Sequence, residues 1–379
     1  MKSFKNARVY VDGQGIIKTD LLFDERIVKI GICESEGEAI LLPDDAVVLP
    51  GFIDQHIHGA CGADAMDGTK EALDTIARAL AKEGTTAFLA TTMTQSRENI
   101  LSAMTAVREY GEGEDGARLI GIHLEGPFIA EEYKGAQPSE YVAKPDVRVF
   151  DEYNEASGGR IKIVTLAPEC EGADALISHL ADKGIATSIG HTGAKCRDIE
   201  AAIALGAKNV THTYNAQSPL HHREIGTVGS AMLFDELACE LIADTIHVSI
   251  PAMKLLYKSK PEGKLVLITD AMRAKGLPDG ESELGGQRVF VKNGEARLAD
   301  GALAGSVLSM NLALKNMIEK IGLTLEQACD LATINPAKVL GIENEAGSIR
   351  EGKRADFAVL DGDYNVLYTV RGGEIIYKR

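Results

Sequence analysis

Histidine and carboxylate side chains stand at the carboxyl ends of several short apolar runs in this sequence. They are His56, His58, Glu125, His191, His212 and Asp270. Strand side chains alternate between two faces, so His56 and His58 share one face and can bind one metal ion. An isolated pair of this spacing is more often one buried histidine and one exposed histidine. The further ligand-type residues at equivalent positions favour a metal site.

Glu125 ends the apolar run LIGIHLEG (119–126), directly before Gly-Pro. A buried carboxylate is costly unless it is paired or coordinated, and a divalent cation would explain its position. His123 lies two residues earlier on the same face, so we expect it to pack beneath the site rather than bind metal. His191 and His212 each follow an apolar run, although either alone could be a loop or helix-cap histidine. Together these ligands suit zinc, iron(II) or a similar ion rather than calcium or magnesium.

Asp270 follows the apolar run LVLIT in LVLITDAM. A carboxylate that faces a metal-bound water can accept the water's proton and later deliver it to a leaving group. The alternative is an N-cap for the following segment. We interpret Asp270 as the catalytic acid/base.

The elements that must position these residues alternate between strands and helices. Helical segments are predicted at 70–82, 173–182, 195–205 and 307–321. Eight strand candidates occur at 51–59, 85–92, 119–126, 161–169, 185–192, 208–214, 239–244 and 264–271. Repeated strand–helix alternation over roughly 290 residues favours an α/β fold, a (β/α)8 TIM-type barrel, whose active site lies at the carboxyl ends of the strands.

The two ends of the chain have a different sequence pattern, which is typical of short strands and hairpins. Short β-branched or aromatic runs bounded by glycine and aspartate occur before residue 50 and again from 347 to 379. We therefore expect residues 1–50 and 344–379 to form one small discontinuous β-sandwich domain. Residues 51–343 are then the catalytic barrel.

The composition is that of a globular protein of 379 residues, with 45% hydrophobic and 25% charged residues. A net charge of −16 argues against a broad surface for nucleic acid or anionic lipid. No apolar run is long enough for a membrane span, and no targeting segment is expected. The six cysteines, Cys33 included, form no paired motif, which indicates a reduced, cytoplasmic protein.

A set of motifs in chain order resembles one family. They are PGFIDQHIHG, HLEGPF with KGAQ downstream, APE, GHT, THTYNAQSPLHHREIG, ADTIHV, ITDAM, LAGS, and NPA followed by GSIREGKRAD. Between about residues 46 and 360 the chain is similar to the N-acetylglucosamine-6-phosphate deacetylases of the amidohydrolase superfamily. The resemblance implies a metal-dependent hydrolase that releases acetate and glucosamine 6-phosphate.

Position by position, the resemblance assigns Glu125, His191 and His212 as the principal metal ligands. His56 and His58 match ligands for a second metal, so one or two ions of zinc or iron are expected per subunit. Asp270 matches the acid/base.

The resemblance also implies substrate contacts. They are Gln137, Asn215, Ala216, Arg223 and His247. Arg223 is expected to bind the phosphate, because a guanidinium recognises phosphate through a bidentate fork. In the family this arginine is expected to reach into the site of the neighbouring subunit, which implies a homodimer. Without the family, residues 221–223 could be a solvated loop.

Two residues depart from the family pattern. Some members have histidine at Gln137, and a glutamine can donate a hydrogen bond there but cannot carry positive charge. Thr245 replaces the usual glycine and is expected to tighten the pocket near His247.

Three alternatives remain open at this point. One is a deacetylase for N-acetylgalactosamine 6-phosphate, because the sequence does not resolve the epimer. Another is a cyclic-amide hydrolase or deaminase, which commonly uses a carboxylated lysine where this chain has Glu125. The last is a non-catalytic scaffold, which should have lost some of the ligands or the acid/base.

Overall fold

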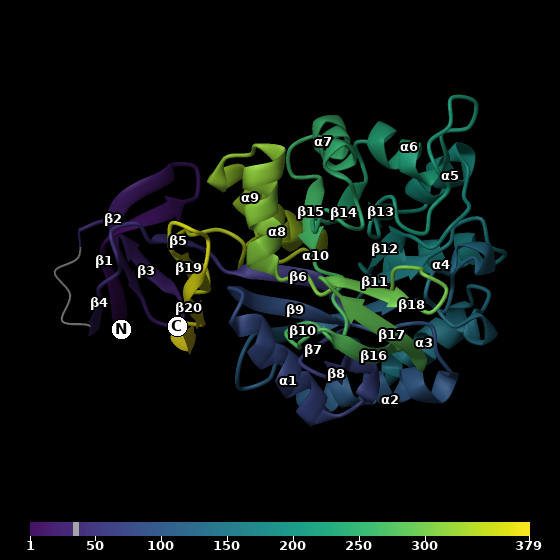
Figure 1. Cartoon of the computed structure of the whole chain (residues 1–379), viewed down its shortest axis with the longest axis horizontal. Helices are drawn as coiled ribbons and strands as arrows, with labels where there is room; N and C mark the ends of the chain where they lie inside the picture. Colours follow the sequence, from purple (N-terminus) through teal and green to yellow (C-terminus); the bar gives the residue numbers. More distant parts are fainter. Residues whose placement is uncertain (33–37) are drawn as a thin grey trace.

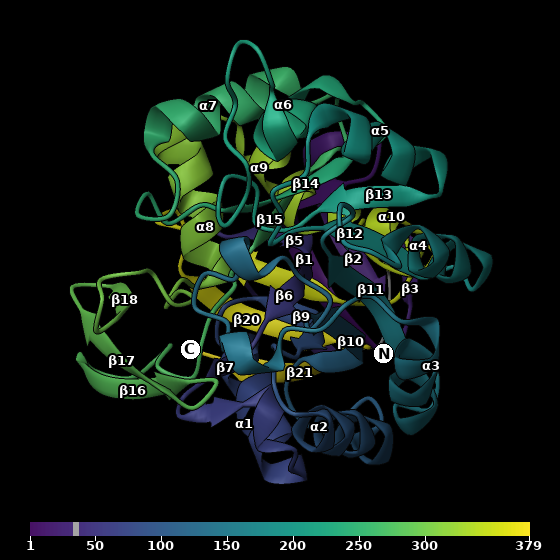
Figure 2. The same cartoon turned by 90° about the vertical axis from the view of Figure 1, so that its right-hand side faces the viewer.

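The computed structural model describes residues 1–32 and 38–379. Within them, eight parallel strands lie side by side in chain order and form a nearly closed barrel (Figures 1 and 2). They are β6 (Phe52–Ile57), β9 (Thr85–Thr91), β10 (Arg118–Glu125), β11 (Ile161–Leu166), β12 (Ala186–Ile189), β13 (Ala207–Val210), β14 (Ala238–Ile242) and β15 (Leu265–Ile268). The predicted barrel is confirmed, with each strand inside or close to its predicted range.

The barrel closes where β6 and the adjoining His58 bond to the segment that follows β15. The Asp270 amide donates to the His56 carbonyl at 2.8 Å, and the His58 amide donates to the Ala271 carbonyl at 2.9 Å. The Asp54 carboxylate accepts from the Thr269 hydroxyl at 2.5 Å. The closure therefore fixes the first histidine pair directly beside Asp270.

Helices surround the barrel, as its apolar strands require. They are α1 (Lys70–Ala81), α2 (Arg97–Tyr110), α3 (Val147–Ala156), α4 (Ala173–Asp182), α5 (Cys196–Ala204), α6 (Gly226–Leu233), α7 (Ile250–Ser259), α8 (Met310–Asn316), α9 (Leu325–Ala332) and α10 (Ile334–Leu340). Short turns are η1 (Ala65–Asp67), η2 (Glu131–Tyr133), η3 (Ser139–Tyr141) and the π-helical η4 (Met317–Ile321). Helix α1 shows the local logic: the Thr69 hydroxyl caps it, and Leu73, Ile76 and Leu80 are buried. Three predicted helices match within about a residue at each end, whereas the fourth begins at Met310 and ends as the π-helical turn.

The two chain ends form a separate β domain beside the barrel (Figure 1). Its strands pair in the order β21–β20–β19–β5–β1–β2–β3, with β4 also paired to β1. They are β1 (Lys2–Val11), β2 (Gly15–Phe23), β3 (Ile27–Ile30), β4 (Glu38–Ile40), β5 (Val47–Pro50), β19 (Phe357–Leu360), β20 (Val366–Arg371) and β21 (Glu374–Lys378). The rings of Phe4, Phe23 and Phe357 meet in its core with centroids 5.1–6.0 Å apart. The sandwich-type domain is confirmed, and its division from the barrel at residues 50 and 343 stays a prediction.

An antiparallel sheet that the sequence analysis did not foresee lies near the barrel mouth (Figure 2). Its strands are β16 (Gly280–Leu284), β17 (Gln287–Lys292) and β18 (Glu295–Leu298), and a small ribbon pairs β7 (Gly59–Ala60) with β8 (Ala63–Asp64). Both hairpin turns have two central residues with positive φ, Gly285–Gly286 and Asn293–Gly294, as tight hairpins favour. The Gln287 amide ties the sheet to the Ala136 carbonyl beside the site.

The fold contains no helix, among the residues described, that is long and apolar enough to cross a membrane. The described cysteines are unpaired thiols, and Cys33 lies outside the described residues.

Candidate active site

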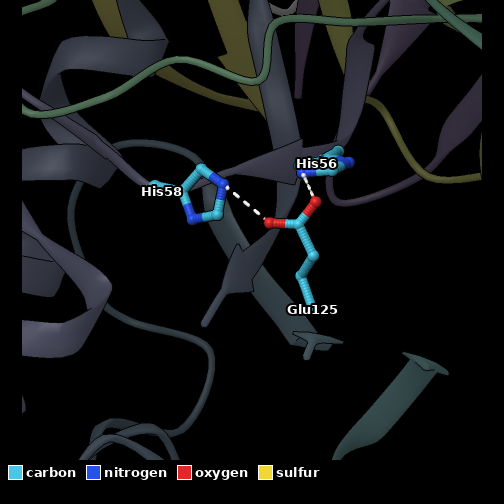
Figure 3. Close-up of side chains that lie close together, drawn as sticks. All are labelled: His56, His58 and Glu125. Atoms are coloured by element: carbon cyan, nitrogen blue, oxygen red, sulfur yellow. Dashed lines mark ion pairs between the residues drawn. The ribbon is translucent and has the colours of Figure 1, made fainter. Parts of the chain in front are cut away.

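The six residues that the sequence singled out converge at the carboxyl end of the barrel, and all six are buried. Glu125 lies at their centre. Its Oε1 is 3.1 Å from His212 Nε2 and 3.2 Å from His191 Nε2. Figure 3 shows the other side, where His56 and His58 point Nε2 at the two carboxylate oxygens from 3.4 and 3.3 Å.

Asp270 lies against the same histidine pair. Its Oδ1 is 3.2 Å from His58 Nε2 and 3.4 Å from His56 Nε2. The structure thus brings together every predicted ligand and the predicted acid/base around one point.

The backbone turns sharply where these side chains leave the barrel. His191, His212 and Asp270 have φ values of 48°, 30° and 47°, in the left-handed region that non-glycine residues rarely adopt. Such strain persists where the surrounding structure fixes it, and it clusters at functional sites. Here it directs the side chains toward the common centre.

The donor set fits a divalent metal. Glu125 belongs to two groups of ligand atoms that lie close together, one with His56 and His58 and the other with His191 and His212. His56 Nε2 is buried and makes no hydrogen bond, although it faces Glu125 and Asp270. Imidazole nitrogens and carboxylate oxygens that converge in a buried site, with one nitrogen lacking a hydrogen bond, suit a borderline divalent cation.

The electrostatics of the site also favour positive charge. Burial lowers the pKa of His58, but its contacts with Asp270 and Glu125 outweigh this and raise it to about 10. Burial raises the pKa of Asp270, but the neighbouring His56 and His58 outweigh this and lower it to about 2. The carboxylates therefore hold positive charge between them, which a divalent ion can supply in place of protons.

His123 lies below the centre and has no free nitrogen. Its Nδ1 is 3.1 Å from the Gln55 carbonyl oxygen, and its Nε2 is 2.7 Å from the Thr165 hydroxyl. Burial lowers its pKa to about 3, so the ring is neutral. This agrees with the expectation that His123 supports the site without binding metal.

A cavity of about 360 Å³ opens beside the centre. Gln137 is one of its lining residues, but its amide is already engaged. The Nε2 donates to Glu125 Oε2 at 2.9 Å, and the Oε1 accepts from the Thr94 amide at 2.6 Å. Because the Thr94 amide can only donate, the orientation of the Gln137 side chain is fixed.

Asn215, Ala216 and His247 also line this cavity. His247 is fixed by Asp244, whose carboxylate lies 2.6 Å from its Nδ1 and also accepts from its backbone amide. Thr245, between them, has φ of 69°, a conformation that a β-branched residue adopts at a cost. It is not one of the described residues that line the cavity, and the expected tightening of the pocket stays a prediction.

Arg223 is the predicted substrate residue that the fold leaves outside this cavity. It is exposed in a short hairpin, where its Nη1 lies 2.9 Å from His222 Nε2. The described residues that line the cavity include no lysine or arginine.

Two supporting carboxylates escaped the sequence analysis. Glu240 is fully buried in β14 and contacts His56, and Glu169 accepts from the Gly193 amide next to the His191 turn. The sequence offered one indication of Glu240, because it is a charged residue inside the otherwise apolar strand candidate CELIAD. Glu169 stands in the APE motif, which was quoted without assigning this residue a role.

The sequence model of the amidohydrolase family matches residues 47–376, so the chain belongs to the amidohydrolase family. The N-acetylglucosamine-6-phosphate deacetylase of Bacillus subtilis (strain 168) is 46% identical over 91% of this chain and 88% of the relative. The N-acetylgalactosamine-6-phosphate deacetylase of Escherichia coli O157:H7 is 38% identical over 85% of this chain and 86% of the relative.

A solved structure extends the likeness to three dimensions. The N-acetyl-D-glucosamine-6-phosphate deacetylase of Mycobacterium smegmatis, a mutant in complex with N-acetyl-D-glucosamine-6-phosphate, has a TM-score of 0.93 and 30% identity, with 100% of this chain and 99% of that chain covered. The resemblance inferred from the motifs is confirmed.

Proposed function

We propose that this protein hydrolyses the acetamide of N-acetylglucosamine 6-phosphate to glucosamine 6-phosphate and acetate. The observation that carries the proposal is the buried Glu125, surrounded by four histidines and facing Asp270 at the barrel mouth. Zinc or iron(II), as one or two ions, suits these ligands. The metal supplies a Lewis acid and an acidified water when it is bound.

Asp270 is the proposed acid/base. Its lowered pKa makes it a carboxylate at the start of the reaction, so it can accept the proton of the attacking water. It then returns that proton to the amine nitrogen as the carbon–nitrogen bond breaks. Gln137, buried against Glu125, keeps that carboxylate in place and lies at the cavity wall where the acetamide enters.

Recognition of the phosphate is assigned to Asn215, the Ala216 amide, His247 and an Arg223 from a second subunit. The absence of a lysine or arginine from the described cavity lining supports a cation supplied in this way. Helix α6 follows the Arg223 hairpin directly in the chain and packs beside α7 (Figure 1). The two helices expose Leu233 and Leu255, which supports a subunit contact here. The proposed working assembly is a homodimer, and unpaired cysteines suit a cytoplasmic enzyme.

A second candidate is deacetylation of N-acetylgalactosamine 6-phosphate, which the Escherichia coli relative favours. The two substrates differ only in the configuration of one hydroxyl group.

The direct test measures acetate release after chelation and metal repletion. The substrates are N-acetylglucosamine 6-phosphate, its galactosamine epimer and unphosphorylated N-acetylglucosamine. We expect the first to have the highest kcat/KM and the last the lowest. A preference for the epimer would replace the first candidate by the second, and no release from any substrate would favour the scaffold alternative.

Subunit exchange tests the proposed role of Arg223. An Arg223→Ala protein and an Asp270→Asn protein should each be nearly inactive, because each lacks one part of every site. A mixed dimer contains one site with both parts, so mixing should restore up to a quarter of wild-type activity if the subunits exchange at random. If mass analysis shows mixed dimers without recovered activity, Arg223 does not act across the interface.

A further inference from the structure

A continuous chain of buried polar side chains lies inside the barrel, one layer beneath the site. From His123, hydrogen bonds pass through three hydroxyl groups, Thr165, Thr211 and Ser188, at 2.5–2.7 Å. From Ser188 they continue through the Asn209 amide to Glu240. We call these residues, with Gln55 and His56, the polar belt. Their side chains are all fully buried, although TIM-type barrels are normally filled with apolar side chains.

The direction of each hydrogen bond in the belt follows from its first member. The Gln55 carbonyl can only accept, so His123 Nδ1 donates to it. Neither partner of this fully buried ring is an anion, so the ring carries one proton and accepts at Nε2. Thr165 must then donate to His123. Each hydroxyl has one proton, so Thr211 donates to Thr165 and Ser188 donates to Thr211. Ser188 can therefore only accept from the Asn209 amide nitrogen.

Glu240 receives the far end of this chain. Its Oε1 accepts from the side-chain amides of Gln55 and Asn209 at 2.7 and 3.0 Å. Its Oε2 accepts from the His212 backbone amide at 3.3 Å, and His56 Nδ1 lies 3.0 Å from the same oxygen. Three of these four groups can only donate, which is an environment that suits a carboxylate without a proton, and such a carboxylate accepts from His56 Nδ1 as well.

This arrangement decides which nitrogen of His56 faces the site. With its proton on Nδ1, His56 presents Nε2 toward Glu125 Oε1 and Asp270 Oδ1, each 3.4 Å away. A metal-binding imidazole commonly donates its other ring N–H to a carboxylate, which fixes both the tautomer and the ring orientation.

We propose that Glu240 is a positioning residue that commits His56 Nε2 to metal binding. Glu240 touches neither the cavity nor the reacting atoms. It acts through His56, and through the His212 backbone it also links the two ligand groups that share Glu125. The inference rests on the proposed function only in requiring a divalent cation, and its test measures metal rather than acetate.

The Glu240→Gln substitution preserves shape but cannot accept from all four donors. If its oxygen faces Gln55 and Asn209, its NH2 group faces His56, which must then move its proton to Nε2 to accept. The reverse orientation places the NH2 group against two side-chain amide donors. We expect the variant to bind Co²⁺ at the His56 side 10- to 100-fold more weakly than wild type, measured by titrating metal-free protein and following the visible absorption of the ion.

A double-mutant cycle with His56→Gln separates positioning from general stability. We expect Glu240→Gln to weaken Co²⁺ binding by less than threefold once His56 is absent. An equal loss in both backgrounds, or no effect of His56→Gln itself, would overturn the proposal. Ser188→Ala is the matched control, because it breaks the belt but leaves all four donors to Glu240, so its Co²⁺ affinity should stay within threefold of wild type.

A measurement on unaltered protein covers the case in which Glu240→Gln does not fold. In ¹⁵N-histidine spectra of the Zn²⁺-loaded wild-type protein, the resonances absent from His56→Gln identify His56. The proposal expects a protonated Nδ1 and a metal-shifted Nε2. A proton on Nε2 would overturn it.

Discussion

The interior of the barrel and the core of the β domain are equally buried but are filled with different chemistry. The β-domain core is made of apolar contacts such as those of Phe4, Phe23 and Phe357. The barrel interior beneath the site instead holds Glu240, His123 and the rest of the polar belt. Burying a polar group is unfavourable unless it is hydrogen-bonded, so stability alone would favour the first solution. The polar belt is therefore the layer of the barrel whose residues support the proposed active site rather than stability alone.

The largest expected effect distinguishes the buried carboxylate Asp270 of the site from a partly buried carboxylate of the β domain, Asp361. Asp270→Asn should lower kcat/KM by about 10³- to 10⁴-fold, because the amide cannot accept and return a proton. Asp361→Asn is the matched control, since Asp361 organises the turn between β19 and β20 and pairs with Arg379 inside the β domain. The activity of this variant should stay within twofold of wild type. Steady-state kinetics and metal analysis check both, and near wild-type turnover of Asp270→Asn with full metal content would contradict the assignment.

A substitution in the β-domain core should affect stability rather than catalysis. Phe357→Ala removes a fully buried ring and should lower the free energy of unfolding by about 3–5 kcal/mol. Turnover per folded molecule should be unchanged, because the described ring contacts of Phe357 lie in the β-domain core, with Phe4 and Phe23. Urea unfolding and active-site titration with a tight-binding metal measure the two quantities. Loss of turnover in fully folded protein would show that the two regions are coupled.

Metal removal should affect the barrel more than the β domain. An ion that binds only the folded state stabilises it by about 2.7 kcal/mol when its free concentration is 100 times its dissociation constant. Chelation should therefore lower the protection of the barrel strands against amide hydrogen exchange. Adding Zn²⁺ should restore that protection. An equal fall in protection of β1 and β19 would indicate that the domains unfold as one unit.

The predictable part of the molecule is the part in which an unusual residue interrupts a regular pattern. Glu125 and Asp270 stood out because a charge ends an apolar run, and the strand–helix alternation gave the barrel. The polar belt did not stand out, because residues such as Thr165 and Ser188 are common in strands and only barrel closure places their hydroxyl groups within bonding distance. The hairpins of β16–β18 were also missed, although Gly285–Gly286 and Asn293–Gly294 are typical two-residue turns. No sequence pattern of one chain can locate Arg223 relative to a second subunit.

The smallest expected effects come from removing one hydroxyl group from the barrel interior and from adding one to the β-domain core. Ser188→Ala leaves the Thr211 oxygen without its donor and removes an acceptor for Asn209, so unfolding should become easier by about 1–3 kcal/mol. Val359→Thr makes the opposite change in the β-domain core and should cost a similar amount, because it places a hydroxyl in a fully buried cluster of apolar side chains. Denaturant unfolding measures both. If Ser188→Ala were instead neutral, the belt hydroxyls would not be obligatory hydrogen-bonding partners, and the proton order traced from His123 to Glu240 would lose its support.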